Sequence, residues 1–341
     1  MPELLIHCGL HKTGTTALQN FLFANVEVLA GLGISYPRAG IPAAYGLTGH
    51  HNLAWWLGRD RRYMSDVGEF DALFKEIDGF TGRTVLLSSE DFENSLLHPA
   101  RWTGVAARAA SLGFSVRFLV YTRNVTDHLE SVFLQKLRSG FGDEFSQVAR
   151  TVVETGNLRS KEWQACFDAR AIAKSLAQVP GTELSFRDYE SLVGGSTIAD
   201  FCAFMGLDHV TWQAPMDARV NPRNPIETSL VLFLLNRDGT LSQRQSEVDA
   251  FVRAQFAGKA ARLVTPPRLR QVMEERLMGK ASAPRASAAG DLNIARVFSF
   301  ETQVMFRESF AIAHSDAPPQ QRSRQVAARM AQWWAWAADT A

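Results

Sequence analysis

The chain has 341 residues, 46% of them hydrophobic and 21% charged, which is the composition of an ordinary globular protein with a sizeable core. Lys and Arg number 36 against 35 Asp and Glu, so no overall field attracts nucleic acid or an anionic membrane, and any anion site must be local. The three cysteines lie far apart, which argues against a disulfide framework and against a cysteine metal site. No basic leader and no apolar run near the roughly 18 residues of a membrane span are present, so we expect a cytoplasmic protein.

Short apolar runs alternate with helical patterns over the first two thirds of the chain. Residues 4–6 lead into a glycine-containing loop, and a helical stripe follows from Leu18 to Leu29. Further buried strands are predicted at residues 84–87, 115–121 and 182–186, and a helix closed by Gly206 follows the last of them. Strands that alternate with helices predict an α/β fold with a doubly wound, mostly parallel sheet of the P-loop nucleotide-binding type.

The pattern after Pro225 is helical throughout, with no convincing strand. We therefore predict an α/β core of residues 1–215 and a helical C-terminal extension of residues 216–341 packed on it. The last helix has a clean apolar stripe that ends with Trp333, Trp334 and Ala337, and such a stripe favours packing on the domain. Trp336 lies off the stripe, so peripheral contact with a membrane interface stays an alternative.

The loop Gly9–Thr16 stands between the first strand and the first helix, where backbone N–H groups and the positive helix end point at an anion. Gly9 and Gly14 have P-loop spacing, but Thr15 stands where an ATP-using loop has its lysine. Lys12 lies inside the loop instead, where a cation can reach a bridging oxygen near a 5′-phosphate, with Thr15 and Thr16 donating hydroxyl hydrogen bonds. The alternative is that the loop has no role in binding and is a turn that only caps a helix.

A second anion site is predicted where the strand of residues 115–121 ends. Arg123 follows this strand, and Ser131 comes about two turns into the next helix, so together they could hold a phosphate monoester. Both this site and the first loop would lie at the carboxyl edge of a parallel sheet, where ligands bind. Two phosphate sites on one edge fit a nucleotide with 5′ and 3′ phosphates. Taken alone, Arg123 could equally form a surface salt bridge.

These segments resemble the sulfotransferase superfamily that uses 3′-phosphoadenosine 5′-phosphosulfate (PAPS). Gly9–Thr16, followed by Ala-Leu-Gln, is similar to its 5′-phosphosulfate loop, in the form G-L-x-K-T-G-T-T of a bacterial branch. Arg123–Ser131 resembles its 3′-phosphate motif, with Val125 where proline is usual, and residues 184–206 resemble its "YEDL … FLG" stretch. The resemblance covers roughly residues 3 to 210.

The resemblance implies a P-loop-like fold and transfer of a sulfuryl group from PAPS to a hydroxyl or amine, without a metal. The residues that it assigns to the donor are His11, Lys12, Thr13, Gly14, Thr15, Thr16, Arg123 and Ser131. Similarity to the bacterial branch implies a cell-surface carbohydrate or glycolipid as the acceptor, in a site that the C-terminal extension would help to shape. The late basic loop of the animal enzymes is not found; Arg219, Arg223, Lys280 and Arg285 are candidates to replace it.

Transfer to a hydroxyl needs a base, and Glu90 is the first candidate because it follows a buried strand at the same sheet edge. Related sulfotransferases similarly place a glutamate after the corresponding strand. The neighbouring Asp91 is predicted to cap the following helix. His50 and His51 are the rival bases, since an imidazole titrates near neutral pH. His11 is expected to orient the loop backbone.

Two other functions remain open from the sequence. One is a P-loop NTPase or kinase with Glu90 or Asp91 as its Walker B acid, against which Thr15 in the lysine position counts. The other is a non-catalytic PAPS-binding protein, against which the joint presence of Lys12, Glu90 and Arg123 counts. No histidine and carboxylate spacing suggests a metal site.

Overall fold

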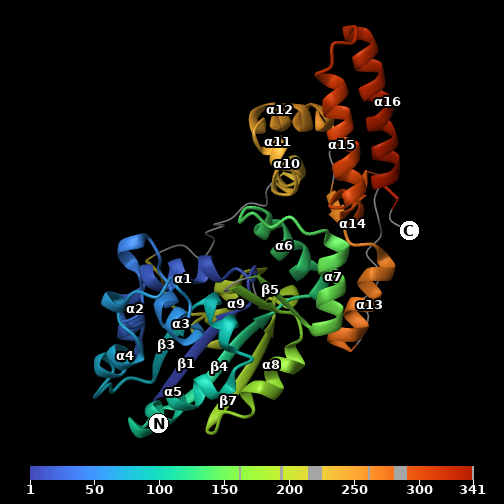
Figure 1. Cartoon of the computed structure of the whole chain (residues 1–341). Helices are drawn as coiled ribbons and strands as arrows, with labels where there is room; N and C mark the ends of the chain where they lie inside the picture. The colour runs from blue at the N-terminus through green and yellow to red at the C-terminus, as the bar shows by residue number, and fades with distance from the viewer. Residues whose placement is uncertain (161–162, 193–194, 214–224, 260–261, 280–289, 340–341) are drawn as a thin grey trace. The chain divides into compact units, whose positions relative to one another are not determined.

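The computed structural model describes residues 1–160, 163–192, 195–213, 225–259, 262–279 and 290–339 (Figure 1). The chain forms two compact units by its internal contacts. The first unit comprises Met1–Asn124 and Gly156–Pro222, and the second comprises Val125–Thr155 and Arg223–Ala341. The division into residues 1–215 and 216–341 stays a prediction, and in this structure residues 125–155 belong to the second unit.

A five-stranded sheet in the order β2-β3-β1-β4-β7 forms the centre of the first unit, and every neighbouring pair is parallel. This confirms the predicted α/β fold with a mostly parallel sheet, and the four predicted strands are β1, β3, β4 and β7. The strand bounds are Glu3–Gly9 (β1), Ile34–Ser35 (β2), Thr84–Ser88 (β3), Ser115–Thr122 (β4) and Thr182–Asp188 (β7).

Two hydrophobic cores cover the two faces of this sheet, because successive side chains of a strand point to opposite faces. Leu4 and Ile6 belong to one core and Leu5 to the other. Helices α3, α4, α5 and α8 contribute to the first core, and α1, α2 and α9 to the second (Figure 1). Their bounds are Thr15–Ala24 (α1), Val26–Gly31 (α2), His51–Gly58 (α3), Phe70–Glu76 (α4), Pro99–Ser111 (α5), Ala169–Leu176 (α8) and Thr197–Phe204 (α9).

The register of the strands brings three loops to one edge of the sheet. Gly9 of β1 lies opposite Tyr121 of β4, and His7 lies opposite Ser88 of β3. The strand order also changes direction at β1, with β2 and β3 on one side and β4 and β7 on the other. Open α/β sheets bind ligands at such a point, outside the carboxyl ends of the strands.

Short 3-10 turns and a hairpin complete the first unit. The 3-10 turns are Ala43–Tyr45 (η1), Ser65–Val67 (η2), Glu90–Ser95 (η3) and Tyr189–Ser191 (η4). An antiparallel hairpin pairs β5 (Asn157–Ser160) with β6 (Trp163–Cys166). The sequence analysis did not predict this hairpin, because four residues per strand are too few for an alternating pattern to be recognised.

The second unit is mainly helical, as predicted for the C-terminal region. It also contains one parallel pair, β8 (Arg262–Val264) with β9 (Asp291–Asn293), so the expectation of no strand after Pro225 is wrong. Three-residue strands paired with a distant segment leave no local pattern to recognise. The helices are Val125–Leu137 (α6), Phe145–Thr155 (α7), Ile226–Arg237 (α10), Gly239–Ser242 (α11), Gln245–Phe256 (α12), Pro267–Met278 (α13), Ile294–Val297 (α14), Phe300–Ala313 (α15) and Pro319–Ala337 (α16).

The predicted apolar stripe of the last helix packs within the second unit. Trp333 of α16 is fully buried, and its indole N–H donates to Thr302 Oγ1 of α15 at 2.9 Å. Trp334 is half-buried, with Lys259 Nζ 4.1 Å from its ring centroid. Trp336 is half-buried as well, and the guanidinium of Arg296 lies 5.5 Å from its ring centroid. The stripe thus packs on α15, as the sequence favoured.

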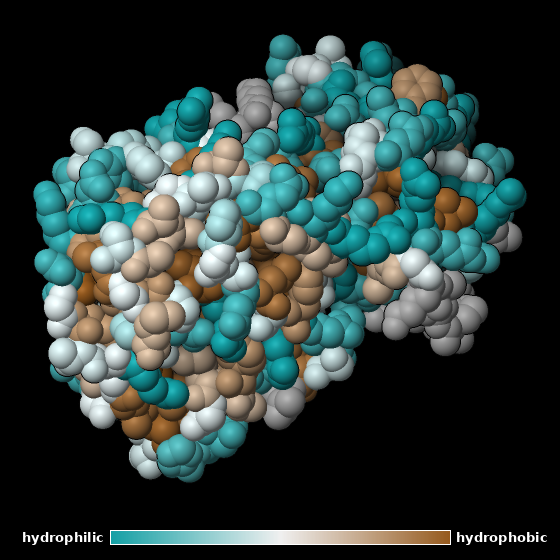
Figure 2. Space-filling model, turned by 90° about the horizontal axis from the view of Figure 1, so that it is seen from below, coloured by the Kyte–Doolittle hydropathy of each residue, from teal (hydrophilic) through white to brown (hydrophobic). Residues whose placement is uncertain are grey.

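The surface carries both hydrophilic and hydrophobic side chains. Hydrophilic side chains are interspersed with hydrophobic ones on the face drawn in Figure 2. None of the helices in the described part of the chain combines the length and the apolar character that crossing a membrane requires.

Candidate functional site

The loop after β1 has an unusual backbone. Lys12 has a φ of 71° and Gly14 a φ of 79°, while Thr13 between them is not in the positive-φ region. Alternation of this kind turns successive N–H groups toward a common centre, which makes an anion-binding concavity. For a residue with a side chain, such as Lys12, the left-handed conformation costs of the order of 1–3 kcal/mol, so the surrounding contacts must hold it there. Gly14 is required, because a Cβ on it would lie 2.5 Å from Thr197 Oγ1.

One internal hydrogen bond and two neighbouring segments fix this loop. Thr13 Oγ1 donates to the carbonyl of Leu10 at 2.7 Å, which closes the turn internally. Thr197, the first residue of α9, donates its hydroxyl to the carbonyl of Thr13 at 2.9 Å. Arg123, which follows β4, donates Nη1–H to the carbonyl of Lys12 at 3.3 Å. The loop is therefore held from two other points of the same sheet edge.

Helix α1 presents its N-terminus to the loop. It has no side-chain cap and no acidic residue in its first turn, so the positive end of the helix is not neutralised by the chain's own carboxylates there. Thr15 is buried with its Oγ1 3.4 Å from Thr13 Oγ1, and Thr16 is half-buried. An anion in the concavity of the loop would meet the first-turn N–H groups and the Thr16 hydroxyl. The five loop residues from Lys12 to Thr16 thus form one continuous segment, and that it binds an anion stays a prediction.

The backbone N–H and both ring nitrogens of His11 have hydrogen-bond partners. Its backbone N–H donates to Glu93 Oε2 at 2.9 Å, and its ring Nδ1 lies 2.6 Å from the same oxygen. The indole N–H of Trp163 donates to its Nε2 at 3.0 Å, so that nitrogen is the acceptor and the ring proton is on Nδ1. Burial lowers the pKa of His11, but the hydrogen bond and charge of Glu93 outweigh it and leave the pKa above its ordinary value. In this arrangement Glu93 and Trp163 hold His11, and the role of His11 in orienting the loop stays a prediction.

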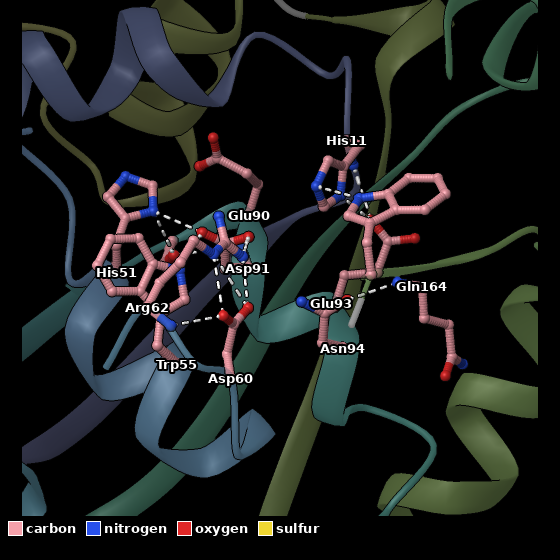
Figure 3. Close-up of polar contacts among 12 residues, drawn as sticks. His11, His51, Trp55, Asp60, Arg62, Glu90, Asp91, Glu93, Asn94 and Gln164 are labelled. Carbon is pink, nitrogen blue, oxygen red and sulfur yellow. Dashed lines mark hydrogen bonds and ion pairs between the residues drawn. The ribbon is translucent and has the colours of Figure 1, made fainter. Parts of the chain in front are cut away.

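Glu90 begins η3, directly at the edge of the sheet. Its Oε2 accepts a hydrogen bond from Gln19 Nε2 of α1 at 2.8 Å. Gln19 lies against Gly49, where a Cβ would come within 2.6 Å of its side chain. Figure 3 shows the Glu90 carboxylate pointing away from Asp91. The amide of Gln19 therefore orients Glu90 from the helix that carries the phosphate loop.

His51 and Asp91 form a buried pair beside Glu90. The Nδ1 of His51 lies 3.0 Å from Asp91 Oδ2 and 3.1 Å from Ser89 Oγ. Because a carboxylate only accepts, the proton on the ring is on Nδ1, and Nε2 is the basic nitrogen. Asp91 also accepts the indole N–H of Trp55 at 2.8 Å and an Arg62 N–H at 3.2 Å. Such a dyad fixes both the tautomer and the direction of the imidazole.

The charges of this cluster shift its pKa values in opposite directions. Burial lowers the pKa of His51, but the hydrogen bond with Asp91 and the nearby charges of Glu90 and Asp91 prevail and raise it. Burial raises the pKa of Asp91, but His51 and Arg62 prevail and hold it well below its usual range. Arg62 is itself paired with Asp60, Nη2 to Oδ2, at 2.6 Å. Nε2 of His51 therefore binds a proton with an affinity that depends on the charge of Asp91.

Asp91 was predicted to cap the helix after β3, and this is wrong. The cap of η3 is Ser89, whose hydroxyl accepts the N–H of Asp91 at 3.1 Å. The Asp91 carboxylate is turned toward His51 and Arg62, while Glu93 is turned toward His11 on the other side of the same turn (Figure 3).

His50 has a structural role, unlike its neighbour His51. Its Nδ1 accepts the N–H of Ser88 at 3.1 Å, and its Nε2 lies 3.0 Å from the carbonyl of Pro37. Burial lowers its pKa to about 3. With both nitrogens occupied by backbone groups, His50 ties the segment before α3 to strand β3 and is not placed to accept a proton.

Arg123 and Ser131, the predicted second anion site, fall in different units. Arg123 is mostly buried, contacts Glu190 at 3.4 Å and lies 5.2 Å from the ring centroid of Tyr189. Ser131 lies in α6 and donates to the carbonyl of Asp127 at 2.8 Å. That the two hold one phosphate stays a prediction. Arg219, Arg223, Lys280 and Arg285 lie outside the described residues.

Sequence reasoning missed the groups that support these side chains, which are Gln19, Glu93, Trp163 and Thr197. One signal was available: Glu90, Asp91 and Glu93 form an acidic cluster directly after a buried strand, and carboxylates in such a place need partners. Among the described residues, no group of three or more His, Cys, Asp or Glu side chains is arranged to hold a metal ion.

No protein-family model matches the sequence. No curated protein matches it either. A solved structure to which the chain is similar is the crystal structure of a sulfotransferase from Alicyclobacillus acidocaldarius, at 18% sequence identity and a TM-score of 0.37. The match covers 69% of this chain and 92% of that one. A likeness of this size assigns neither a family nor an activity to the chain.

Proposed function

We propose that this protein is a sulfotransferase that moves the sulfuryl group of PAPS to a hydroxyl or amine of an acceptor. The observation that carries the proposal is the position of Lys12. It stands in the left-handed conformation inside an anion-binding loop, whereas Thr15 occupies the place of the lysine that an ATP-using loop needs. The acceptor class that the sequence resemblance implies is a surface carbohydrate or glycolipid.

The proposed step breaks the bond between the sulfur and the bridging oxygen of the 5′-phosphate while the acceptor oxygen bonds to sulfur. The electron pair stays on the phosphate oxygen, where negative charge grows. The loop N–H groups, Lys12 and the N-terminus of α1 stabilise that charge, because donors aimed at developing charge act mainly on the transition state. Arg123 would hold the 3′-phosphate, with Ser131 as its predicted partner.

The acceptor proton goes to Glu90 in this proposal. Its carboxylate lies at the sheet edge and is oriented by Gln19, the residue one turn after Thr15 and Thr16 in α1. His51 is the alternative base, favoured by its pairing with Asp91 at 3.0 Å. General base catalysis typically contributes about 10²–10⁴-fold, so the variant that removes the true base should lose activity on that scale.

The direct test is transfer of labelled sulfate from PAPS into a lysate, followed by identification of the labelled product. We expect Lys12→Ala and Glu90→Gln each to abolish most of the transfer, while Lys75→Ala, which removes an exposed lysine of α4, leaves it intact. If His51→Gln loses more transfer than Glu90→Gln, the base is His51. Full transfer by both Lys12→Ala and Glu90→Gln would contradict the proposed mechanism.

The competing NTPase or kinase function is separated by binding. We expect calorimetry to detect adenosine 3′,5′-bisphosphate but no tight, Mg²⁺-dependent binding of ATP, since the loop lacks the lysine that contacts β- and γ-phosphates. Tight binding of Mg-ATP without binding of the bisphosphate nucleotide would exclude the sulfotransferase. Binding of the bisphosphate nucleotide with no transfer to any acceptor would favour a non-catalytic PAPS-binding protein.

A further inference from the structure

Glu93 joins three parts of the first unit that are far apart in sequence. Its carboxylate is fully buried in η3 and accepts the N–H and the ring Nδ1 of His11 on one side. On the other side Glu93 Oε1 accepts the N–H of Cys166 at 2.6 Å. The next residue, Asn94, accepts the N–H of Gln164 at 2.9 Å. The turn η3 thus connects the phosphate loop to strand β6 of the hairpin.

The hairpin also reaches the loop directly. Trp163, the first residue of β6, donates its indole N–H to His11 Nε2, and the two rings meet edge to face with their centroids 5.5 Å apart. With the Glu93 contacts, every hydrogen-bonding atom of the His11 ring and its backbone N–H has a partner. His11 therefore has little freedom to turn.

The residue that follows His11 is Lys12. Its left-handed backbone conformation is strained for a residue with a side chain, so neighbouring contacts must hold it. Its neighbours are fixed on both sides, by Glu93 at His11 and by Thr197 at the carbonyl of Thr13. A loop held in its binding shape before the ligand arrives does not lose affinity to the cost of ordering itself.

We propose that Glu93 and Trp163 are positioning residues for anion binding: they clamp His11 and thereby keep Lys12 in the conformation that receives a phosphate or phosphosulfate group. The identity of that anion as the 5′ group of PAPS rests on the proposed function. The clamp, by which Glu93 and Trp163 hold His11, does not depend on the proposed function, because it applies to any phosphate-type anion that enters the loop.

The test measures anion affinity in Glu93→Gln and Trp163→Phe. Glutamine keeps the shape of Glu93 but loses the charge and one acceptor oxygen, and phenylalanine keeps an aromatic ring but loses the donor to His11. By calorimetry we expect the Kd for adenosine 3′,5′-bisphosphate to rise about tenfold in each variant with one site per chain retained. A protein that is merely less stable would instead bind with fewer sites per chain at the same Kd.

Trp102→Phe is the matched control. It also removes a buried indole N–H, which donates to the carbonyl of Ser95 at 3.2 Å, and it does not touch the loop. We expect it to keep the wild-type Kd. The indole N–H resonance of Trp163, identified by its loss in Trp163→Phe, should shift in Glu93→Gln because the His11 ring is released.

The outcomes distinguish this inference from the proposed function. If the wild type binds the bisphosphate nucleotide and both variants bind it with the same Kd, the clamp is excluded and the function stands. If the wild type binds pyrophosphate but not the nucleotide, the proposed function fails. The Kd for pyrophosphate, compared between the wild type and the two variants, then shows whether Glu93 and Trp163 position the loop. If the wild type binds neither probe, both fail. If Glu93→Gln does not fold, Trp163→Phe gives the answer.

Discussion

Asp91 and Glu93 stand two residues apart on one 3-10 turn, yet they serve opposite sides of the candidate site in different ways. Asp91 faces a cation, Arg62, whose side chain is 46% exposed, and an imidazole that can bind a proton. Glu93 has no exposed surface and accepts hydrogen bonds from two backbone N–H groups and the Nδ1–H of His11. The first arrangement can respond to pH and salt, whereas the second depends on fixed geometry. In the proposed function, Asp91 and His51 form the proton-handling side of the candidate site, and Glu93 with the loop of residues 9–16 forms its ligand-holding side.

The largest expected effect is the loss of stability in Glu93→Ala. The change leaves buried donors at His11 and Cys166 without an acceptor, and each such group costs about 1–3 kcal/mol, so we expect the free energy of unfolding to fall by about 3 kcal/mol or more in urea denaturation. Glu76→Ala is the control, because Glu76 accepts the N–H groups of Arg38 and Ala39 at the surface and water can replace it. Equal losses of unfolding free energy in the two variants would contradict the prediction that burial makes the hydrogen bonds of Glu93 harder for water to replace.

The next largest effect is expected from a substitution that strains the loop after β1, on the ligand-holding side. Gly14→Ala places a Cβ at a φ of +79° and 2.5 Å from Thr197 Oγ1, and we expect it to cost about 2 kcal/mol of stability and to weaken anion binding. Gly46→Ala meets the same backbone strain at a φ of +73° with nothing within 4 Å. Thermal unfolding should show a smaller loss for Gly46→Ala, of about 1 kcal/mol, with binding unchanged. A Gly14→Ala protein that matched Gly46→Ala in both respects would show that the loop has room to adapt.

A third prediction tests the proton-handling side through the pKa of His51. Asp91 stabilises the imidazolium, so Asp91→Asn removes a charge that raises this pKa, and the pKa should fall in an NMR titration of the ring protons. If His51 is the base, the acid limb of kcat/KM moves to lower pH in the same variant. An acid limb that does not follow the His51 pKa would exclude His51 as the base.

The smallest expected effect has the opposite sign. Arg62 lowers the pKa of His51, so Arg62→Gln should raise it, and by less than Asp91→Asn lowers it, because the guanidinium is nearly half exposed and water screens it. The same NMR titration measures it. Shifts of Asp91→Asn and Arg62→Gln in the same direction would refute the electrostatic account of this cluster.

The sequence predicted what local patterns encode. The strands at residues 4–6, 84–87, 115–121 and 182–186 are recognisable as buried apolar runs, because such a run is a property of neighbouring residues. The glycine spacing of the loop after β1 is local as well, and that this loop binds phosphate stays a prediction. The roles of Asp91 and Glu93 could not be predicted, since their partners His51 and His11 lie 40 and 82 residues away. The burial that separates these carboxylates from Glu90 arises only when the elements pack.

The clamp on the phosphate loop also has a consequence for the order in which the protein can mature. His11 and Trp163 are separated by 152 residues, and Thr13 and Thr197 by 184. Contacts of such long range form late, because the chain between them must first be closed into a loop. The loop of residues 9–16 is therefore completed only after residue 197 has emerged from the ribosome. A nascent chain would therefore acquire the closed shape of this loop only near the end of synthesis of the first unit.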